Sequence, residues 1–162
     1  MITDLYKPAE LNITGLCKFW FAPIDWFKYV SIKFLTQLEI KYIEFDAINN
    51  HRWLVGYNNN TITEVETTQK QSDNGIMYET NVIFFIPTDN ENLRLQLHKM
   101  EQMPFIIMVK ETSGTVKIIG DKNSACKLSL KFTNKQGKKG YDLTFTCLNT
   151  NLPYTYKDVL PL

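Results

Sequence analysis

The stretch that decides the fold runs from Ile76 to Thr146 and has the sequence IMYETNVIFFIPTDNENLRLQLHKMEQMPFIIMVKETSGTVKIIGDKNSACKLSLKFTNKQGKKGYDLTFT. Apolar and polar residues alternate through most of it, which is the two-residue period of a half-buried strand. Glycine-containing turns separate the alternating segments. The stretch therefore predicts a succession of antiparallel strands, and no catalytic motif interrupts it.

One short α-helix is predicted over about residues 90–102. The apolar residues that recur there at helical spacing are Leu93, Leu97 and Met100. Thr88 and Glu91 have the T-x-x-E form of a capping box, in which each side chain satisfies a free backbone N–H at the helix start. Pro104 follows the segment, so we expect the helix to end before it.

The apolar run from Phe105 to Val109 is typical of a central strand that is covered on both faces. Turns at 112–114 and 134–140 predict two hairpins. The weakly apolar segment from Thr61 to Gln71 predicts a strand at the edge of the sheet. We therefore expect a mainly β fold, either an antiparallel β-barrel or a sandwich, with the one short helix.

The chain of 162 residues fits a single domain, 1–162. Residues 1–14 have an irregular pattern and are interpreted as an N-terminal arm that orders only against a partner. Residues 15–151 form the predicted β-rich core. Residues 152–162 are too short and too rich in proline for a core element and are interpreted as a C-terminal tail.

The charges are nearly balanced, since 18 Lys and Arg oppose 17 Asp and Glu to give a formal net charge of +1. No global field exists to attract nucleic acid or an anionic membrane, and no stretch has the apolar length of a membrane span. The 3 cysteines are odd in number, and none falls in a C-x-x-C pair. Cys126 and Cys147 lie in strand-like patterns, which predicts free, buried thiols in a reducing cytoplasm.

Residue types that carry chemistry are sparse. His51 and His98 have no Cys, Asp or Glu at metal-ligand spacing. Glu64 and Glu66 share one face of an extended segment, where a solvated edge strand is favoured over a catalytic pair or a calcium site. No catalytic residue, metal ligand or cofactor-binding residue is predicted, and we do not expect an enzyme. A small hydrolase with scattered catalytic residues stays as a third hypothesis.

Aromatic residues make up 13% of the chain and are the remaining candidates for a functional surface. Aromatic side chains near irregular ends either fill the core or anchor a neighbouring subunit, and the sequence favours these two roles equally. The candidate interface residues are Trp20, Trp26, Tyr154 and Tyr156.

The order of these elements resembles a known family. The segment GLCKFWFAP, residues 15–23, is similar to the opening of small virion proteins from tailed phages of gut bacteria. The segment NGIMY (74–78), the short helix, the strand from Phe105 to Val109, the Ser113-Gly114 turn and GYDLTF (140–145) follow the layout of tail-tube and head–tail connector proteins, as in crAss-like phages. The resemblance spans 15–156 and rests on turn glycines and apolar strands.

This resemblance implies a tail-tube-like β-barrel or sandwich, repeated in a homo-oligomeric ring of six-fold or twelve-fold symmetry around a channel. The partners it implies are other phage tail or connector proteins, with non-specific proximity to DNA in the channel and no membrane. It places the protein in the virion after assembly in the host cytoplasm, and it carries over no catalytic residues. The segments 1–14, 61–71 and 152–162 are those we expect to make the contacts between copies.

A competing hypothesis is a monomeric binding module. In that case the barrel or sandwich would hold a small ligand or glycan with Trp20, Trp53 and nearby tyrosines.

Overall fold

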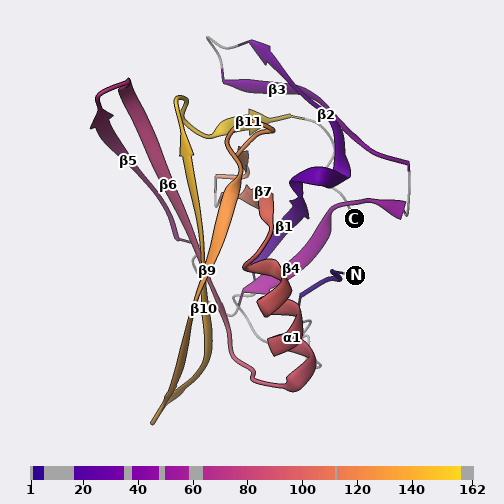
Figure 1. Cartoon of the computed structure of the whole chain (residues 1–162), viewed down its shortest axis with the longest axis vertical. Coiled ribbons are helices and arrows are strands. Elements are labelled where there is room, and N and C mark those ends of the chain that lie inside the picture. The colour runs from indigo at the N-terminus through magenta and orange to yellow at the C-terminus, as the bar shows by residue number, and fades with distance from the viewer. Residues whose placement is uncertain are drawn as a thin grey trace.

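The computed structural model describes residues 2–5, 17–34, 38–47, 50–58, 64–111 and 113–157. These ranges contain eleven strands, one α-helix and one short 3₁₀ helix, η1 (Ile24–Trp26). The strands are β1 (Cys17–Pro23), β2 (Phe27–Phe34), β3 (Glu39–Phe45), β4 (Leu54–Asn58), β5 (Glu64–Ser72), β6 (Gly75–Ile86), β7 (Pro104–Lys110), β8 (Val116–Ile119), β9 (Cys126–Lys135), β10 (Lys138–Asn149) and β11 (Tyr154–Tyr156). The helix is α1 (Glu91–Met100) (Figure 1). The prediction of a mainly β chain with one short helix is confirmed.

All eleven strands belong to one hydrogen-bonded sheet that forks at β7. One edge of β7 pairs with β1, which in turn pairs with β4. The other edge pairs with β9 at Pro104 and Phe105, and with β8 from Ile107 to Lys110. Two series of paired strands continue the sheet from this edge, in the orders β8-β11-β3-β2 and β9-β10-β6-β5 (Figure 1). Within the described strands β2 and β5 do not pair with each other, so the sheet is open and matches the sandwich alternative better than a closed barrel.

The two central strands, β1 and β7, are buried on both faces because successive side chains point to opposite sides of a strand. One face contributes Phe19, Phe21, Phe105, Ile107 and Val109 to a core shared with β6, β9, β10 and α1. The other face contributes Trp20, Ala22, Ile106 and Met108 to a second core, against β2, β3, β8 and β11. This arrangement confirms the prediction of a covered central strand at Phe105 to Val109.

The helix α1 packs on the first core through Leu93, Leu97 and Met100, as predicted. Its start differs from the prediction. The N-cap is Asn90, whose side-chain oxygen accepts a hydrogen bond from the Leu93 N–H at 2.8 Å. The proposed capping box of Thr88 and Glu91 is therefore wrong, because Asn is among the best N-cap residues and stands two positions nearer to the apolar face.

Among the described strands, every pair is antiparallel except β3 with β11, which run parallel. The strand β11 pairs with β8 on its other side, and the Tyr154 side chain is only 1% exposed. The prediction that 152–162 stays outside the core is therefore wrong for Tyr154–Tyr156. The physical reason is that two tyrosines at alternate positions give even a three-residue strand a large surface to pack. Residues 158–162 lie outside the described residues.

At the other end of the chain, Ile2 and Leu5 are buried in the first core. This part of the predicted 1–14 arm therefore packs on its own chain and does not need a partner for order. The rest of that arm, 6–14, lies outside the described residues.

Candidate functional site

The first candidate surface is the edge strand β5. Among the described strands β5 pairs only with β6, and every residue of β5 except Thr67 is exposed. A Thr67–Thr80 hydroxyl contact of 3.0 Å and a Lys70–Glu79 ion pair of 2.6 Å attach β5 to β6. The predicted edge strand is confirmed for residues 64–71, whereas 61–63 lie outside the described residues. An exposed edge of this length offers unpaired backbone groups to another strand.

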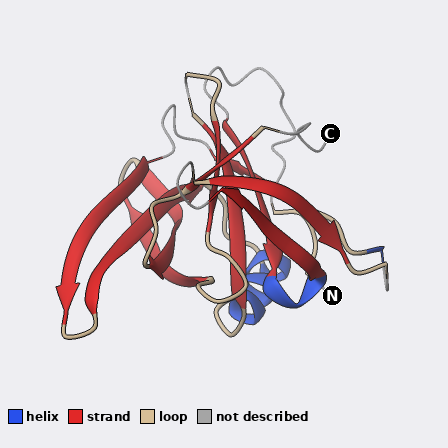
Figure 2. Cartoon of the chain, turned by 90° about the horizontal axis from the view of Figure 1, so that it is seen from above, coloured by secondary structure: helices blue, strands red, loops and turns tan. Residues whose placement is uncertain are grey.

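The tip of the β5–β6 hairpin extends beyond the sheet. The strand β10 pairs with β6 only from Tyr78 to Ile86, so Gly75 to Met77 pair with β5 alone. Figure 2 shows this hairpin projecting from the body on the left. At the opposite end of the strand order, β2 pairs only with β3 among the described strands, and Figure 1 places β2 and β5 on opposite sides of the molecule.

Two of the four predicted interface residues are core residues. Trp20 is 6% exposed and Tyr154 is 1% exposed, and both lie in the second core. Their assignment to an interface is therefore wrong, and the core role that the sequence favoured equally holds for both. Trp26 and Tyr156 are half-buried and pack against the same core. Trp53 is also buried in the second core, so Trp20 and Trp53 are not available to hold a ligand in the binding-module hypothesis.

The second candidate is a cavity of about 940 Å³ that sequence reasoning missed. Four segments meet at it: the N-terminal segment 2–5, η1, residues 50–54 and the C-terminal end of α1. Its lining residues are Ile2, Thr3, Trp26, Asn50, His51, Arg52, Leu54, Lys99, Gln102 and Met103. The His51 ring stacks on the Trp26 ring with centroids 4.7 Å apart and planes 4° from parallel. No local pattern could have revealed this site, because its walls are distant in the sequence.

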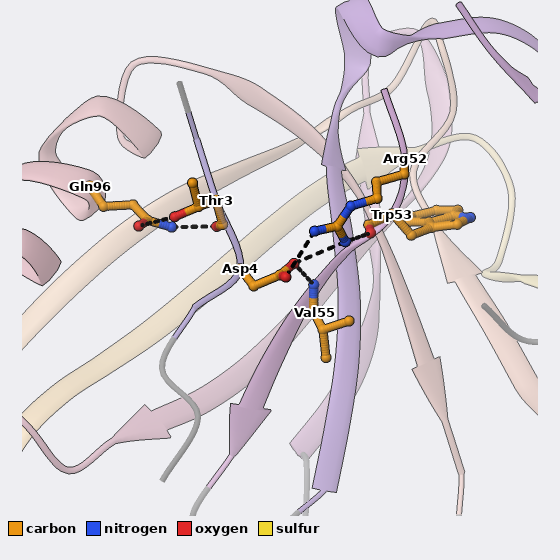
Figure 3. A network of polar contacts seen from close by, with 6 residues as sticks. All are labelled: Thr3, Asp4, Arg52, Trp53, Val55 and Gln96. Atoms are coloured by element: carbon orange, nitrogen blue, oxygen red, sulfur yellow. Dashed lines mark hydrogen bonds and ion pairs between the residues drawn. The ribbon is translucent and has the colours of Figure 1, made fainter. Parts of the chain in front are cut away.

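The N-terminal segment forms one wall of the cavity and is held by a polar network (Figure 3). Arg52 donates to both carboxylate oxygens of Asp4, at 3.3 and 2.9 Å, and the Val55 N–H donates to Asp4 at 2.8 Å. Burial alone would raise the pKa of Asp4, but the hydrogen bonds from Arg52 and Val55 outweigh it and lower the pKa. Gln96 on α1 donates to the Thr3 carbonyl at 2.5 Å. The wall is thus fixed to β4 on one side and to α1 on the other.

Side chains that could hold a metal ion are not grouped in the described part of the chain. No set of three His, Cys, Asp or Glu residues is placed to hold a metal ion there. His98 is exposed on α1, 3.7 Å from Glu101. Cys126 and Cys147 are free and buried, as predicted, and burial raises the pKa of the Cys126 thiol well above its ordinary value.

In the described part of the chain, the helix α1 is too short and too polar to cross a membrane.

Comparisons with models of protein families, with curated proteins and with solved structures find no match to this chain.

Proposed function

We propose that this chain is a structural subunit of a tailed-phage virion that forms a ring in the tail or the head–tail connector, as a tail tube, tail terminator or adaptor protein. The observation that carries the proposal is that β5 and β2, at opposite ends of one sheet, each pair with a single neighbour among the described strands. A head-to-tail contact joins two different surfaces of one subunit, and it closes into a ring when the rotation between copies is right. The protein then acts by self-assembly and by contact with neighbouring virion proteins, and not as an enzyme.

The proposed contact is strand addition along β5. Backbone hydrogen bonds supply the affinity in this mode of pairing, and alternate side chains supply the specificity. The nine residues of β5 give a long template. Trp26 and Tyr156, which keep part of their surface exposed, are the two predicted interface residues still able to contribute to such a contact. Six-fold or twelve-fold symmetry and proximity to DNA in the channel belong to the same proposal.

The test is the oligomeric state of the purified protein, measured by native mass spectrometry and light scattering. We expect a closed ring or a concentration-dependent oligomer. A stable monomer at every concentration would contradict the proposal and would favour a monomeric binding module.

Two proline variants test the role of the β5 edge. In an antiparallel pair only every second residue directs its N–H toward the neighbouring strand. One of Thr68→Pro and Gln69→Pro therefore keeps the β5–β6 hydrogen bonds and blocks the outer edge, whereas the other disrupts the hairpin. The variant that keeps the thermal stability of the wild type should lose assembly. Asn92→Ala, on the exposed face of α1, is the control that should assemble normally.

A further inference from the structure

We propose that the cavity between the N-terminal segment, η1, residues 50–54 and the end of α1 is a binding site for a small organic anion, with a phosphate or carboxylate group on an apolar body. This inference does not rest on the assembly proposed above, because no residue of β5 lines the cavity. Trp26 is the one residue named in both proposals.

The charge of the wall favours an anion. Among the described lining residues, Arg52 and Lys99 carry permanent positive charge, and none is Asp or Glu. Asp4, outside the lining, offsets the charge of Arg52. Lys99 is exposed and has no ion-pair partner in the described part of the chain, so its ammonium group leaves the wall with a net positive charge.

Donors for the anionic group are available on both cationic side chains. Arg52 uses three hydrogen bonds, two to Asp4 and one to the Trp53 carbonyl at 2.9 Å. A guanidinium group has five N–H donors, so two have no partner among the described residues, and the Lys99 ammonium group provides three more. Hydrogen bonds between such cations and phosphate or carboxylate oxygens are roughly twice as strong as those between neutral groups.

The position of Lys99 in α1 makes its charge important for binding an anion. The C-terminal end of a helix carries partial negative charge, which would repel an anion. Lys99 lies in the last turn of α1 and offsets this charge at the cavity. Removing its charge should therefore leave the helix end facing the ligand without compensation.

The rest of the wall suits an apolar body. Ile2 and Leu54 are buried in the first core, and Met103 packs against it. The stacked Trp26 and His51 rings form a flat part of the lining. A volume of about 940 Å³ lies within the range of small-molecule sites, roughly 300–1,000 Å³, which combine an apolar lining with a few polar groups.

The cavity has walls that the fold fixes. The Asp4–Arg52 ion pair, at 2.9 Å, ties segment 2–5 to residues 50–54, and the Gln96 bond to Thr3, at 2.5 Å, ties it to α1. The Trp26–His51 stack ties η1 to residues 50–54. The charged groups and the apolar wall are therefore held together before a ligand arrives, which lowers the entropic cost of binding.

The experiment is calorimetric titration of the full chain with four probes: phenyl phosphate, benzoate, phenol and inorganic phosphate. We expect phenyl phosphate, benzoate or both to bind at least about tenfold more tightly than phenol and inorganic phosphate, because only the first two combine both chemistries. The comparison of phenyl phosphate with benzoate distinguishes a phosphate ligand from a carboxylate ligand. Equal or tighter binding of phenol or of inorganic phosphate, or no binding of any probe, would overturn the proposal.

Three lysine variants test the charge. Lys99→Gln should weaken binding of the preferred probe about tenfold, the usual effect of losing a charge-assisted hydrogen bond, and Lys99→Arg should retain binding. Lys127→Gln, on the exposed face of β9, is the matched control and should bind like the wild type. Because both positions are exposed, circular dichroism should show the same fold in all three variants. Unchanged affinity in Lys99→Gln would overturn the assignment.

Discussion

The Tyr154 hydroxyl donates a 2.9 Å hydrogen bond to the carboxylate of Asp121, and both residues are buried. The same carboxylate oxygen accepts from the Asn149 side chain at 3.0 Å. The other oxygen accepts from the backbone N–H groups of Asn123 and Ser124, at 2.8 and 2.9 Å. These bonds offset the cost of burying a carboxylate. They also fasten the β8–β9 loop and the end of β10 to β11.

Tyr154→Phe should lower the free energy of unfolding by about 1.5–3 kcal/mol, because it removes the hydrogen bond to the buried carboxylate and the weaker one that the hydroxyl accepts from the Asn151 side chain at 3.3 Å. Urea denaturation at pH 7 measures this loss. Tyr78→Phe is the control, since Tyr78 is half-buried and its hydroxyl forms no hydrogen bond within the described residues. A loss in Tyr154→Phe no larger than in Tyr78→Phe would contradict the role of the bond.

The same variant tests a pH dependence at alkaline pH. Burial, and then the hydrogen bond to Asp121, raise the pKa of Tyr154 above its ordinary value. The folded state therefore holds the protonated hydroxyl more strongly than the unfolded state does. Its contribution is fully present below the unfolded pKa of about 10 and is lost as pH rises from there toward the folded pKa. Tyr154→Phe should show a shallower alkaline loss of stability than the wild type, and an equal slope would argue against this assignment.

Asp89 should govern part of the stability at acid pH. Arg94 binds its two oxygens at 2.7 and 3.1 Å, and the Tyr141 hydroxyl donates to it at 2.9 Å. The hydrogen bond from Arg94 is the main reason that the pKa of Asp89 lies below its usual value. The stabilisation is therefore present above the unfolded pKa of about 4 and is lost as pH falls through the folded pKa.

Asp89→Asn should consequently reduce the change in urea midpoint between pH 5 and pH 2. Asp25→Asn, at an exposed position in η1, should leave that change as in the wild type. If Asp89→Asn and the wild type lose stability in parallel on acidification, the carboxylate does not have the assigned role.

Gly56 is required by the packing of the first core. A Cβ atom at this position would overlap the ring of Phe19. Phe19 is fully buried and stacks on Phe84 with ring centroids 3.6 Å apart, so it has no room to move. Gly56→Ala should therefore destabilise the protein by about 1–3 kcal/mol, the usual range for overpacking.

A double variant separates this clash from other effects of the alanine. Phe19→Leu removes the ring, so adding Gly56→Ala to it should cost much less than in the wild type. Thermal unfolding of the four proteins completes the cycle. Additive losses would show that the two positions do not compete for the same space.

The local sequence pattern was sufficient to predict the elements whose partners are close in the sequence. The alternation of β9 and β10 and the helical spacing of α1 are visible within ten or so residues, and each was predicted. Ile24 to Phe34 shows no single period, because the chain changes there from η1 to an irregularly paired β2. The strand β11 has three residues, and its order depends on β3 and β8, which no local signal connects to it.

The cavity could not be predicted for the same reason. Thr3 and Gln96 are 93 residues apart, and Asp4 and Arg52 are 48 apart. Each of these side chains is ordinary for an exposed position. Only the folded chain brings them to one wall, so neither the composition nor the spacing of residues predicts the cavity.

The contacts that residues 2–5 make within their own chain argue against an arm that orders only against a partner. Leu5 is 1% exposed, and its N–H donates to the Val55 carbonyl at 2.9 Å. Leu5→Ala should destabilise the monomer fold by about 2–4 kcal/mol through the cavity that it leaves. Asp4→Ala should cost about 1 kcal/mol, since its ion pair with Arg52 is largely exposed.

Hydrogen exchange and native mass spectrometry on Asp4→Ala distinguish the two roles of the segment. If residues 2–5 serve only their own chain, the amides of Leu5 and Val55 should exchange faster while the oligomeric state stays that of the wild type. Asp4→Asn should show a smaller effect on exchange, because its side-chain oxygen still accepts from the Val55 N–H. A change of oligomeric state in Asp4→Ala at unchanged exchange would contradict docking within one chain and would support an arm that reaches a neighbouring copy.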